Sequence, residues 1–365
     1  MKINEEKFEN LVIKWFQELG YIHENGYEIA PGTDRAERAD YREVFLVERL
    51  RSKLTALNSH VPALAIEDAL TQIIRPNFPS LLQNNREFHR LLRDGVKVQF
   101  QDDGETKGDF VRIIDFENVE NNEYLAINQF SIKGAKHTKR PDIIIFINGI
   151  PIAVIEVKNP ADENKTIVDA FRQLQTYKEE IPDLFNTNEL MVIADLREAR
   201  VGSLTADWEW FMFWRTIDGE TLDPLGTNNE TETLIRGLFR RDFLLEFIRD
   251  FILFEEEKSI VKKIAGYHQF HLVRKAFAKT VEVTKPDNEG KIGVAWHTQG
   301  SGKSISMALY AGKVITAPEM NNPTIIVVTD RNDLDGQLFG TFSNAKEVLR
   351  ETPKQAETLS ESWSV

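Results

Sequence analysis

The stretch RPDIIIFINGIPIAVIEVK, residues 140–158, decides the fold of the first part of this 365-residue chain. Its centre is Asn148-Gly149, a dipeptide that favours a two-residue type I′ turn. Apolar and β-branched residues flank the turn on both sides, and these residue types are enriched in strands. The stretch therefore predicts a β-hairpin whose middle is buried.

The charged residues of this hairpin gather at its open end. Counting outward from the turn places Asp142 opposite Ile155 and diagonally next to Glu156. Because side chains alternate along a strand, Glu156 and Lys158 point to the same face. Buried strands seldom keep ionisable groups unless these are paired or bind a metal. Two interpretations are open: an apolar hairpin with solvated ends, or a site built from two carboxylates and an ammonium.

Two carboxylates beside a lysine suit phosphodiester hydrolysis. Carboxylates bind Mg²⁺, which polarises the phosphate, and the lysine can orient the attacking water or help to deprotonate it. The spacing resembles the PD…(D/E)xK pattern of nucleases, with Pro141-Asp142 as its first half and Glu156-Val157-Lys158 as its second. By itself this pattern is short and degenerate, so the solvated hairpin end stays open as the alternative.

Two neighbouring segments favour the catalytic interpretation. In the predicted helix IVDAFRQLQTY, Gln173 and Tyr177 are one turn apart and share a face. This resembles the QxxxY extension of the same fold in DNA-translocating nucleases, where it supports the site and contacts the DNA backbone. Upstream of Asp142, a basic loop predicts a local DNA-binding surface, with a solvated loop as the alternative. Its residues are Lys133, Lys136, Lys139 and Arg140.

The first helical segment supplies one further candidate ligand. Apolar residues recur at helical spacing through residues 5–21, and Gly20 ends the pattern. Related nucleases often place an acid on this helix, so the resemblance makes Glu9 a third metal ligand beside Asp142 and Glu156. Other acids compete for that role, and a surface glutamate is the alternative for each of them. These competitors are Glu5, Glu6 and Glu18.

The loop HTQGSGKS, residues 297–304, carries a second chemistry. Its glycines let the backbone N–H groups face phosphate oxygens, Lys303 reaches the terminal phosphates, and the Ser304 hydroxyl can ligate Mg²⁺. His297 stands where the standard phosphate loop has its first glycine. The loop resembles motif I of superfamily 2 helicases and translocases. The ATP-binding candidates are Thr298, Gln299, Gly300, Ser301, Gly302, Lys303 and Ser304.

Segments on both sides of this loop extend that resemblance. GYHQFHLVRKAF (266–277) lies where such motors keep an adenine-reading glutamine, which makes Gln269 a candidate, with a surface residue as the alternative. IIVVTDRNDLDGQL (325–338) resembles motif Ia, which follows the nucleic-acid backbone. Strands are expected at 292–298 and 324–330 around a helix from about 303, which together make one turn of a parallel α/β sheet.

The remaining elements follow from hydrophobic periodicity. Helices are expected over 42–58, around 165–180 and through much of 234–280, where FLLEFIRDFILF (243–254) reads as an amphipathic core helix. Short strands are expected as well, and the polar stretch 216–233 predicts a boundary. The expected strands are 96–100, 110–116, 124–132 and 190–195.

Composition limits the compartment and the mode of nucleic-acid binding. The formal net charge of −13 argues against wrapping nucleic acid with the whole surface, although a local basic site remains compatible with it. The chain has no cysteine and no apolar signal core at its start, and its longest apolar run is interrupted by charges. These features favour a cytoplasmic protein that does not enter a membrane.

A PD…ExK nuclease followed by a superfamily 2 motor resembles the R subunit of type I restriction–modification enzymes. Residues 113–134 and 140–160 resemble that family's nuclease segment, and the likeness covers nearly the whole chain. The resemblance implies an α/β fold with a PD-(D/E)xK endonuclease domain at 1–225, a helical linker at 226–285 and a partial RecA-like ATPase domain at 286–365. It also implies Mg²⁺-dependent cleavage of double-stranded DNA, ATP-driven translocation, and assembly with methyltransferase (M) and specificity (S) subunits.

One departure shapes the expectations for this chain. Such motors need an acidic Walker B motif, a second RecA-like domain and an arginine finger, and nothing after motif Ia supplies them before Val365. The sequence thus resembles an N-terminal portion of the R subunit, and we expect no ATP-driven translocation by this chain alone. The alternatives are an ATP-binding assembly module with an inert hairpin, and a helicase fragment without nuclease activity.

Overall fold

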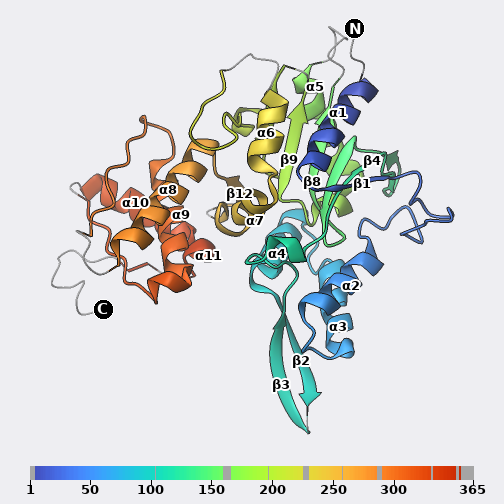
Figure 1. Ribbon diagram of the computed structural model, residues 1–365, viewed down its shortest axis with the longest axis horizontal. Helices are drawn as coiled ribbons and strands as arrows, with labels where there is room; N and C mark the ends of the chain where they lie inside the picture. The colour runs from blue at the N-terminus through green and yellow to red at the C-terminus, as the bar shows by residue number, and fades with distance from the viewer. Residues whose placement is uncertain are drawn as a thin grey trace. The chain divides into compact units, whose positions relative to one another are not determined.

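The computed structural model (Figure 1) divides the chain into two compact units, Met1–Arg249 and Asp250–Val365. It describes residues 5–102, 104–158, 166–195, 197–224, 230–256, 258–285, 290–329, 332–350 and 353–354. Parts of the predicted linker (225–229) and of the polar tail (351–352 and 355–365) lie outside these ranges. No helix among the described residues has the length and apolar character needed to cross a membrane.

The first unit contains seven helices and ten strands within its described residues. Its helices are α1 (Glu5–Glu18), α2 (Val47–Leu57), α3 (Ala63–Ile74), α4 (Leu81–Asp94), α5 (Ile167–Glu180), α6 (Glu230–Leu238) and α7 (Arg241–Asp250). Its strands are β1 (Ile22–Asn25), β2 (Val96–Asp102), β3 (Glu105–Val111), β4 (Tyr124–Asn128), β5 (Ile132–Lys133), β6 (Thr138–Lys139), β7 (Ile143–Ile147), β8 (Ile150–Val157), β9 (Leu190–Ala194) and β10 (Ala199–Gly202).

A six-stranded mixed sheet in the order β1-β4-β7-β8-β9-β10 forms the centre of this unit. The pairs β1–β4 and β8–β9 are parallel, and the other neighbouring pairs are antiparallel. Strands β4, β7, β8 and β9 are buried along their whole length, which explains why they read as continuous apolar runs. The predicted α/β class is therefore confirmed, with a mixed central sheet.

The hairpin predicted from Asn148-Gly149 is present as β7 and β8. Both turn residues have positive φ, 52° and 80°, as a type I′ turn requires. Gly149 also leaves no room for a side chain, because a Cβ there would lie 2.6 Å from the Leu46 carbonyl oxygen. The turn thus fixes where the hairpin starts and presses it against the segment that opens α2.

The register predicted for this hairpin was wrong beyond its first pairs. Phe146 pairs with Pro151, whereas Ile145 pairs with Ala153, so Ile152 is an extra residue in β8. Proline has no N–H for the ladder and is confined to strand ends, edges and bulges, which accounts for the irregularity at this point. As a result Ile143, not Asp142, pairs with Ile155, and the ladder continues toward Asp142 beside Glu156 rather than diagonal to it.

Two helices, α1 and α5, pack against the central sheet and hold the hairpin in place. α1 packs against β1, β4 and β8, and α5 packs along β8 and β9. The predicted helix at 42–58 begins only at Val47, and the predicted strand at 110–116 ends at Val111. Before Val47 the chain instead makes loop hydrogen bonds, such as that from the Leu46 N–H to the Gly149 carbonyl.

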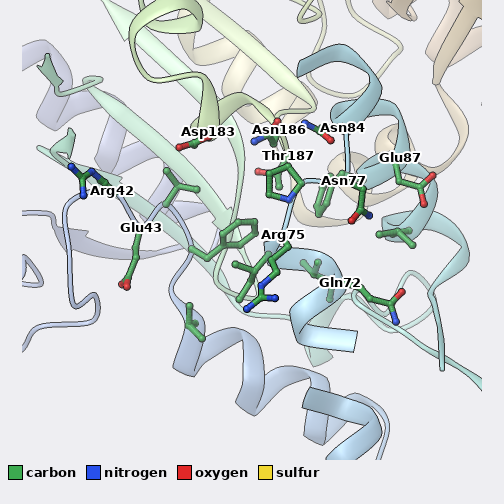
Figure 2. Close-up of a pocket in the computed structure, with 18 residues that line it drawn as sticks. Arg42, Glu43, Gln72, Arg75, Asn77, Asn84, Glu87, Asp183, Asn186 and Thr187 are labelled. Carbon is green, nitrogen blue, oxygen red and sulfur yellow. The ribbon is translucent and has the colours of Figure 1, made fainter. Parts of the chain in front are cut away.

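The first unit contains a cavity of about 350 Å³ (Figure 2). Its apolar lining includes Phe45 and Phe88, and Arg42 and Arg75 reach it from different segments. Thr187, which also lines it, donates a hydrogen bond to the carbonyl of Pro151, close to the turn. The cavity is therefore separated from the charged end of the hairpin by most of the length of β8.

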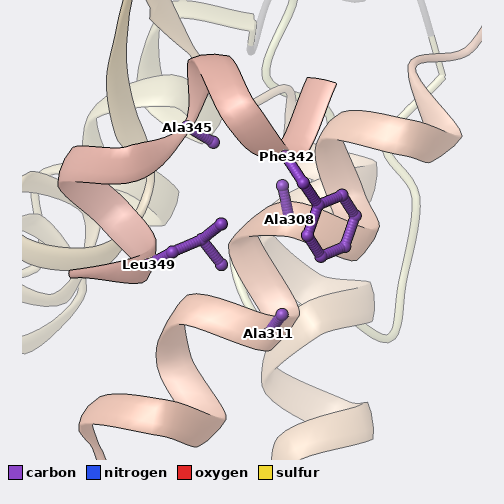
Figure 3. Packing of buried hydrophobic residues seen from close by; sticks show 5 residues of the cluster. All are labelled: Ala308, Ala311, Phe342, Ala345 and Leu349. Carbon is purple, nitrogen blue, oxygen red and sulfur yellow. The ribbon is translucent and has the colours of Figure 1, made fainter. Parts of the chain in front are cut away.

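The second unit contains an antiparallel hairpin and four helices within its described residues. These are β11 (Ile252–Glu256), β12 (Ile260–Ile264), α8 (Tyr267–Val283), α9 (Lys303–Thr316), α10 (Asn332–Asn344) and α11 (Lys346–Leu349). Small and apolar residues of α9, α10 and α11 pack into a core cluster of this unit (Figure 3). The cluster comprises Ala308, Ala311, Phe342, Ala345 and Leu349.

Two predictions for this part of the chain were wrong. The expected helix 243–254 ends at Asp250, and its last residues enter β11, because Ile252-Leu253-Phe254 pairs with β12 instead of continuing the helical face. Residues 292–298 and 324–329 form no strand, and Asp330, the last residue of the second expected strand, lies outside the described residues. Val294 is 98% exposed and Trp296 is 81% exposed. A parallel strand needs sheet neighbours, and none pairs with these segments among the described residues.

Candidate active site

The charged end of the β7–β8 hairpin brings Asp142, Glu156 and Lys158 together. Lys158 Nζ donates to Glu156 Oε1 at 2.6 Å. The backbone N–H of Val157 donates to Asp142 Oδ2 at 2.8 Å, which ties Asp142 to the neighbouring strand. Glu156 is only 2% exposed and Lys158 9%. The predicted pairing of these three side chains is thus present in the geometry, inside the protein rather than at a solvated end.

Burial and close contact shift the pKa values of all three groups in this cluster. Burial first, and then the adjacent Glu156 carboxylate, raise the pKa of Asp142 well above its usual value. Burial likewise raises the pKa of Glu156, although Lys158 opposes the shift. Burial alone lowers the pKa of the Lys158 ammonium, but contact with Glu156 outweighs it and leaves that pKa raised. In this cluster the two carboxyl groups therefore bind protons more readily than exposed acids do.

This arrangement fits a divalent cation at the two carboxylates. Glu156 Oε2 is buried and accepts no hydrogen bond from any described residue. An oxygen without a donor beside a second carboxylate is a natural ligand for Mg²⁺, which prefers one or two carboxylates. Within the described ranges no three acidic or histidine side chains are grouped closely enough to hold a metal together. The divalent cation therefore fits the two carboxylates of Asp142 and Glu156.

Tyr177 reaches this region from α5, and Gln173 lies one turn before it on the same helix. Burial and then the Glu156 carboxylate raise the pKa of Tyr177, whose hydroxyl donates to the Arg140 carbonyl at 3.4 Å. Tyr177 is buried and Gln173 is half-buried on the same helix face. A capping box between Thr166 and Asp169 begins the helix and so fixes its start near the site.

Glu9 lies near the cluster but has partners of its own. Its buried carboxylate accepts hydrogen bonds from Asn128 Nδ2 at 2.7 Å and from Gln129 Nε2. It is close enough to Asp142 to add to the rise in the pKa of that carboxyl. The competing acids Glu5 and Glu18 lie at the two ends of α1, and Glu18 pairs with Arg236.

The predicted DNA-binding residues lie on the β5–β6 hairpin, which leads directly into Asp142. Lys133 and Lys136 are exposed. Lys139 instead makes an ion pair with Glu180 at 2.6 Å. Arg140 stacks on the ring of Tyr27, with its guanidinium carbon 5.4 Å from the ring centroid. Two of the four cations are thus available to a phosphate backbone, and two are already engaged.

In the second unit the phosphate loop closes on itself. Lys303 Nζ donates to the carbonyl oxygens of His297 at 3.0 Å and Thr298 at 3.2 Å. Gln269 Nε2 donates to the Gly302 carbonyl at 3.1 Å, so this glutamine contacts the loop rather than solvent. Gly300 and Gly302 both have positive φ. The remaining loop candidates, Gln299 and Ser304, flank these contacts, and the Ser301 hydroxyl bonds back to Thr298.

Comparison with known proteins identifies the family of this chain. Residues 2–210 match the family described as the type I restriction enzyme R protein N terminus. The chain belongs to the type I restriction enzyme R protein family. Residues 268–363, which include the phosphate loop and Gln269, match the SWI2/SNF2 ATPase family.

Individual members of the R protein family match over most of the chain. The HindI endonuclease subunit of Haemophilus influenzae is 43% identical over 97% of the chain. A putative endonuclease subunit, MjaIXP, of Methanocaldococcus jannaschii is 35% identical over 94% of it. In both cases the chain spans 34% of the length of the relative. The likeness therefore extends over nearly the whole chain, which corresponds to about a third of each relative.

The sequence analysis did not predict the amide side chains that lie beside the Asp142–Glu156–Lys158 cluster of this R protein family member. Asn128 ends β4, Gln129 follows it, and both contact Glu9; His23 Nε2 lies 2.9 Å from Asn128 Oδ1. One signal was available: the expected strand 124–132 contains two amides in an otherwise apolar run. Polar side chains in a buried strand need partners, which points to a neighbouring carboxylate.

Proposed function

We propose that the Met1–Arg249 unit is a Mg²⁺-dependent endonuclease of the PD-(D/E)xK type that cuts double-stranded DNA. In the complete type I enzyme, cleavage is coupled to ATP-driven translocation, and the chain assembles with methyltransferase and specificity subunits in the cytoplasm. One observation carries the proposal: two buried carboxylates with raised pKa values meet one lysine at the end of a sheet. Active sites are where such perturbed groups cluster.

Each residue of the cluster has a distinct part in this proposal. Asp142 and Glu156 hold the cation, and Asp142 is fixed for this by the Val157 N–H. Mg²⁺, when bound, supplies charge neutralisation and polarises the scissile phosphate. Lys158 has donors left beyond its bond to Glu156 and orients the attacking water. Tyr177 and Gln173 support the cluster from α5 and face the DNA backbone.

The basic loop gives the unit a small DNA contact that suits its acidic surroundings. Lys133 and Lys136 are exposed on the hairpin that leads into Asp142, so they lie on the chain segment that enters the site. With a net charge of −13, the rest of the chain repels nucleic acid rather than wrapping it. Target recognition then belongs to another polypeptide of the enzyme.

A nicking assay on supercoiled plasmid tests this proposal. The wild-type chain is expected to nick DNA with Mg²⁺ and not with EDTA, whereas Asp142→Asn and Lys158→Ala abolish nicking. Lys53→Ala is a matched control, since Lys53 is a lysine of α2 that donates to the Asn121 carbonyl. Undiminished nicking by both site variants excludes this cluster as the active site.

The phosphate loop supports a second candidate function, an ATP-binding assembly module. The positive φ of Gly300 and Gly302 and the hydrogen bond from Gln269 to the Gly302 carbonyl support this candidate. On this proposal Lys303 exchanges its carbonyl partners for the terminal phosphates, and Ser304 holds Mg²⁺. Equilibrium dialysis with ATP tests it: Lys303→Ala is expected to weaken binding, and equal binding by the variant contradicts it. The two candidates separate in the nicking assay, because an assembly module alone cuts nothing.

A further inference from the structure

The carboxylate of Glu9 sits in a cradle of neutral amides beside the Asp142–Glu156 pair. Asn128 Nδ2 donates to Glu9 Oε1 at 2.7 Å, and Gln129 Nε2 lies 3.1 Å and 3.3 Å from the two carboxylate oxygens. Glu9 and Asn128 are both buried. Donors on both oxygens hold the carboxylate in one orientation. A glutamate restrained in this way does not swing freely toward a ligand.

The amide of Asn128 is itself oriented by a third residue. His23 Nε2 lies 2.9 Å from Asn128 Oδ1, so a proton on that nitrogen donates to the oxygen and leaves the NH₂ group for Glu9. His23 is on β1 and Asn128 ends β4, the strand beside it. Asn128 also pairs with Ile143, the residue after Asp142. His23, Asn128 and Glu9 thus form a chain of hydrogen bonds that starts on the edge strand β1 and ends at the carboxylate of Glu9.

The backbone is bent to build this cradle. Gln129 has φ 57°, a conformation that side-chain-bearing residues other than Asn and Asp adopt rarely. Gly26 is held against the bend, with its N–H bonded to the Asn128 carbonyl and a Cβ position only 2.6 Å from the Gln129 backbone. Backbone strain of this kind persists where surrounding structure enforces it, and it gathers at functional sites. Here it aims the Gln129 amide at Glu9.

Position decides what Glu9 does. Its partner Asn128 pairs with Ile143, the residue after Asp142, and α1 packs against β8, which carries Glu156, yet the described residues contain no group of three acidic ligands. We propose that His23, Asn128 and Gln129 are positioning residues that hold Glu9 as a fixed negative charge. Glu9 then strengthens binding of the divalent cation at Asp142 and Glu156 without touching it. This inference rests on the proposed nuclease function.

Gln129→Gly is the cleanest variant for testing the cradle. Glycine adopts positive φ without steric cost, so the bend is kept while the amide donor is lost. Loss of a direct partner of a metal ligand typically weakens metal affinity by about 10- to 100-fold, and Gln129 acts one step further out, through Glu9. Titration of the full chain with Mn²⁺ alone, followed by calorimetry, is therefore expected to show an affinity for Gln129→Gly that is weaker by up to about 10-fold. A purely structural role predicts unchanged Mn²⁺ affinity.

His23 supplies a second variant pair with a conservative rescue. His23→Phe removes the donor to Asn128 and is expected to weaken Mn²⁺ affinity, whereas His23→Gln keeps a side-chain NH₂ and restores it. His60→Ala is the matched control, because the half-exposed His60 pairs with Asp109 elsewhere in the unit. Nicking by the weakened variants is expected to recover at high Mg²⁺. If His23→Phe, His23→Gln and His60→Ala all bind Mn²⁺ with the same affinity, the inference is wrong.

Two further outcomes separate this inference from the proposed function. If Glu9→Gln abolishes Mn²⁺ binding as completely as Asp142→Asn does, Glu9 is a direct ligand and the cradle account is wrong. If Asp142→Asn binds Mn²⁺ and nicks DNA like wild type, the proposed function itself fails. If Asp142→Asn loses both while Gln129→Gly and His23→Phe lose neither, the nuclease stands and the cradle does not.

Discussion

Removing the lysine from the active cluster gives the sharpest test of how its charges are balanced. In Lys158→Met the carboxylate of Glu156, 2% exposed, loses the ammonium that donates to it at 2.6 Å. Breaking a buried ion pair from one side costs about 3–5 kcal/mol. Glu156 already has a raised pKa and can take up a proton, which reduces the cost to about 2–4 kcal/mol. Glu156→Gln leaves the better-solvated ammonium and costs about 1–2 kcal/mol.

The double variant Glu156→Gln/Lys158→Met removes both charges and is expected to lie within about 1 kcal/mol of wild type. Urea unfolding of the full chain at pH 7 in EDTA measures all three. Lys14→Met is the matched control, since its ion pair with Glu18 is exposed at 3.9 Å and is worth at most about 1 kcal/mol. Wild-type stability of Lys158→Met, or additive effects in the double variant, refutes the reasoning.

Three further predictions follow from single features of the first unit. Because burial raises the pKa values of Asp142 and Glu156, the free energy of unfolding that these two groups contribute in metal-free protein is greatest below their ordinary values of 3.8 and 4.5 and is lost as the pH rises through the raised values; Asp142→Asn flattens this loss in urea unfolding across pH 4–8. Gly149→Ala, with φ 80° and a Cβ 2.6 Å from the Leu46 oxygen, costs about 2 kcal/mol or more, whereas Gly32→Ala, with open space around it, costs only about 1 kcal/mol in the same assay. Lys133→Ala and Lys136→Ala each weaken DNA binding for all sequences alike and lower the salt slope by about 1, measured by fluorescence anisotropy; an unchanged slope removes them from the DNA surface.

The hairpin and its charged end could be predicted because the information is local. Asn148-Gly149 fixes the turn, the alternation of side chains puts Glu156 and Lys158 on one face, and both features hold in the structure. The register failed because Pro151 disturbs the ladder two residues from the turn, and counting from the turn assumes an unbroken ladder. The observed register brings the two carboxylates closer than the predicted one, since the extra residue in β8 moves Asp142 beside Glu156.

The cradle around Glu9 could not be predicted because it joins residues about 120 positions apart. Glu9 lies on α1, whereas Asn128 ends β4 and Gln129 follows it, and only packing of the helix on the sheet brings them together. From the sequence alone, every acid of α1 is an equally good candidate for a position beside the site. Burial and amide donors single out Glu9.

The strands around the phosphate loop failed for a related reason. The two expected strands, 292–298 and 324–330, have the apolar character of parallel strands, but a strand exists only through its neighbours. Within the described residues nothing pairs with them. The loop between Thr298 and Ser304 depends on local glycine chemistry instead, and Gln269 reaches it by one hydrogen bond from α8.

The central claim is that Asp142 and Glu156 share one divalent cation. Anomalous diffraction from crystals of the chain soaked in Mn²⁺ tests it most directly. The account predicts a peak with oxygens of both carboxylates at about 2.0–2.6 Å, the range of oxygen ligands around hard divalent cations, and Glu9 beyond that range. A peak bound by neither carboxylate, or no peak at this end of the hairpin at saturating Mn²⁺, contradicts it.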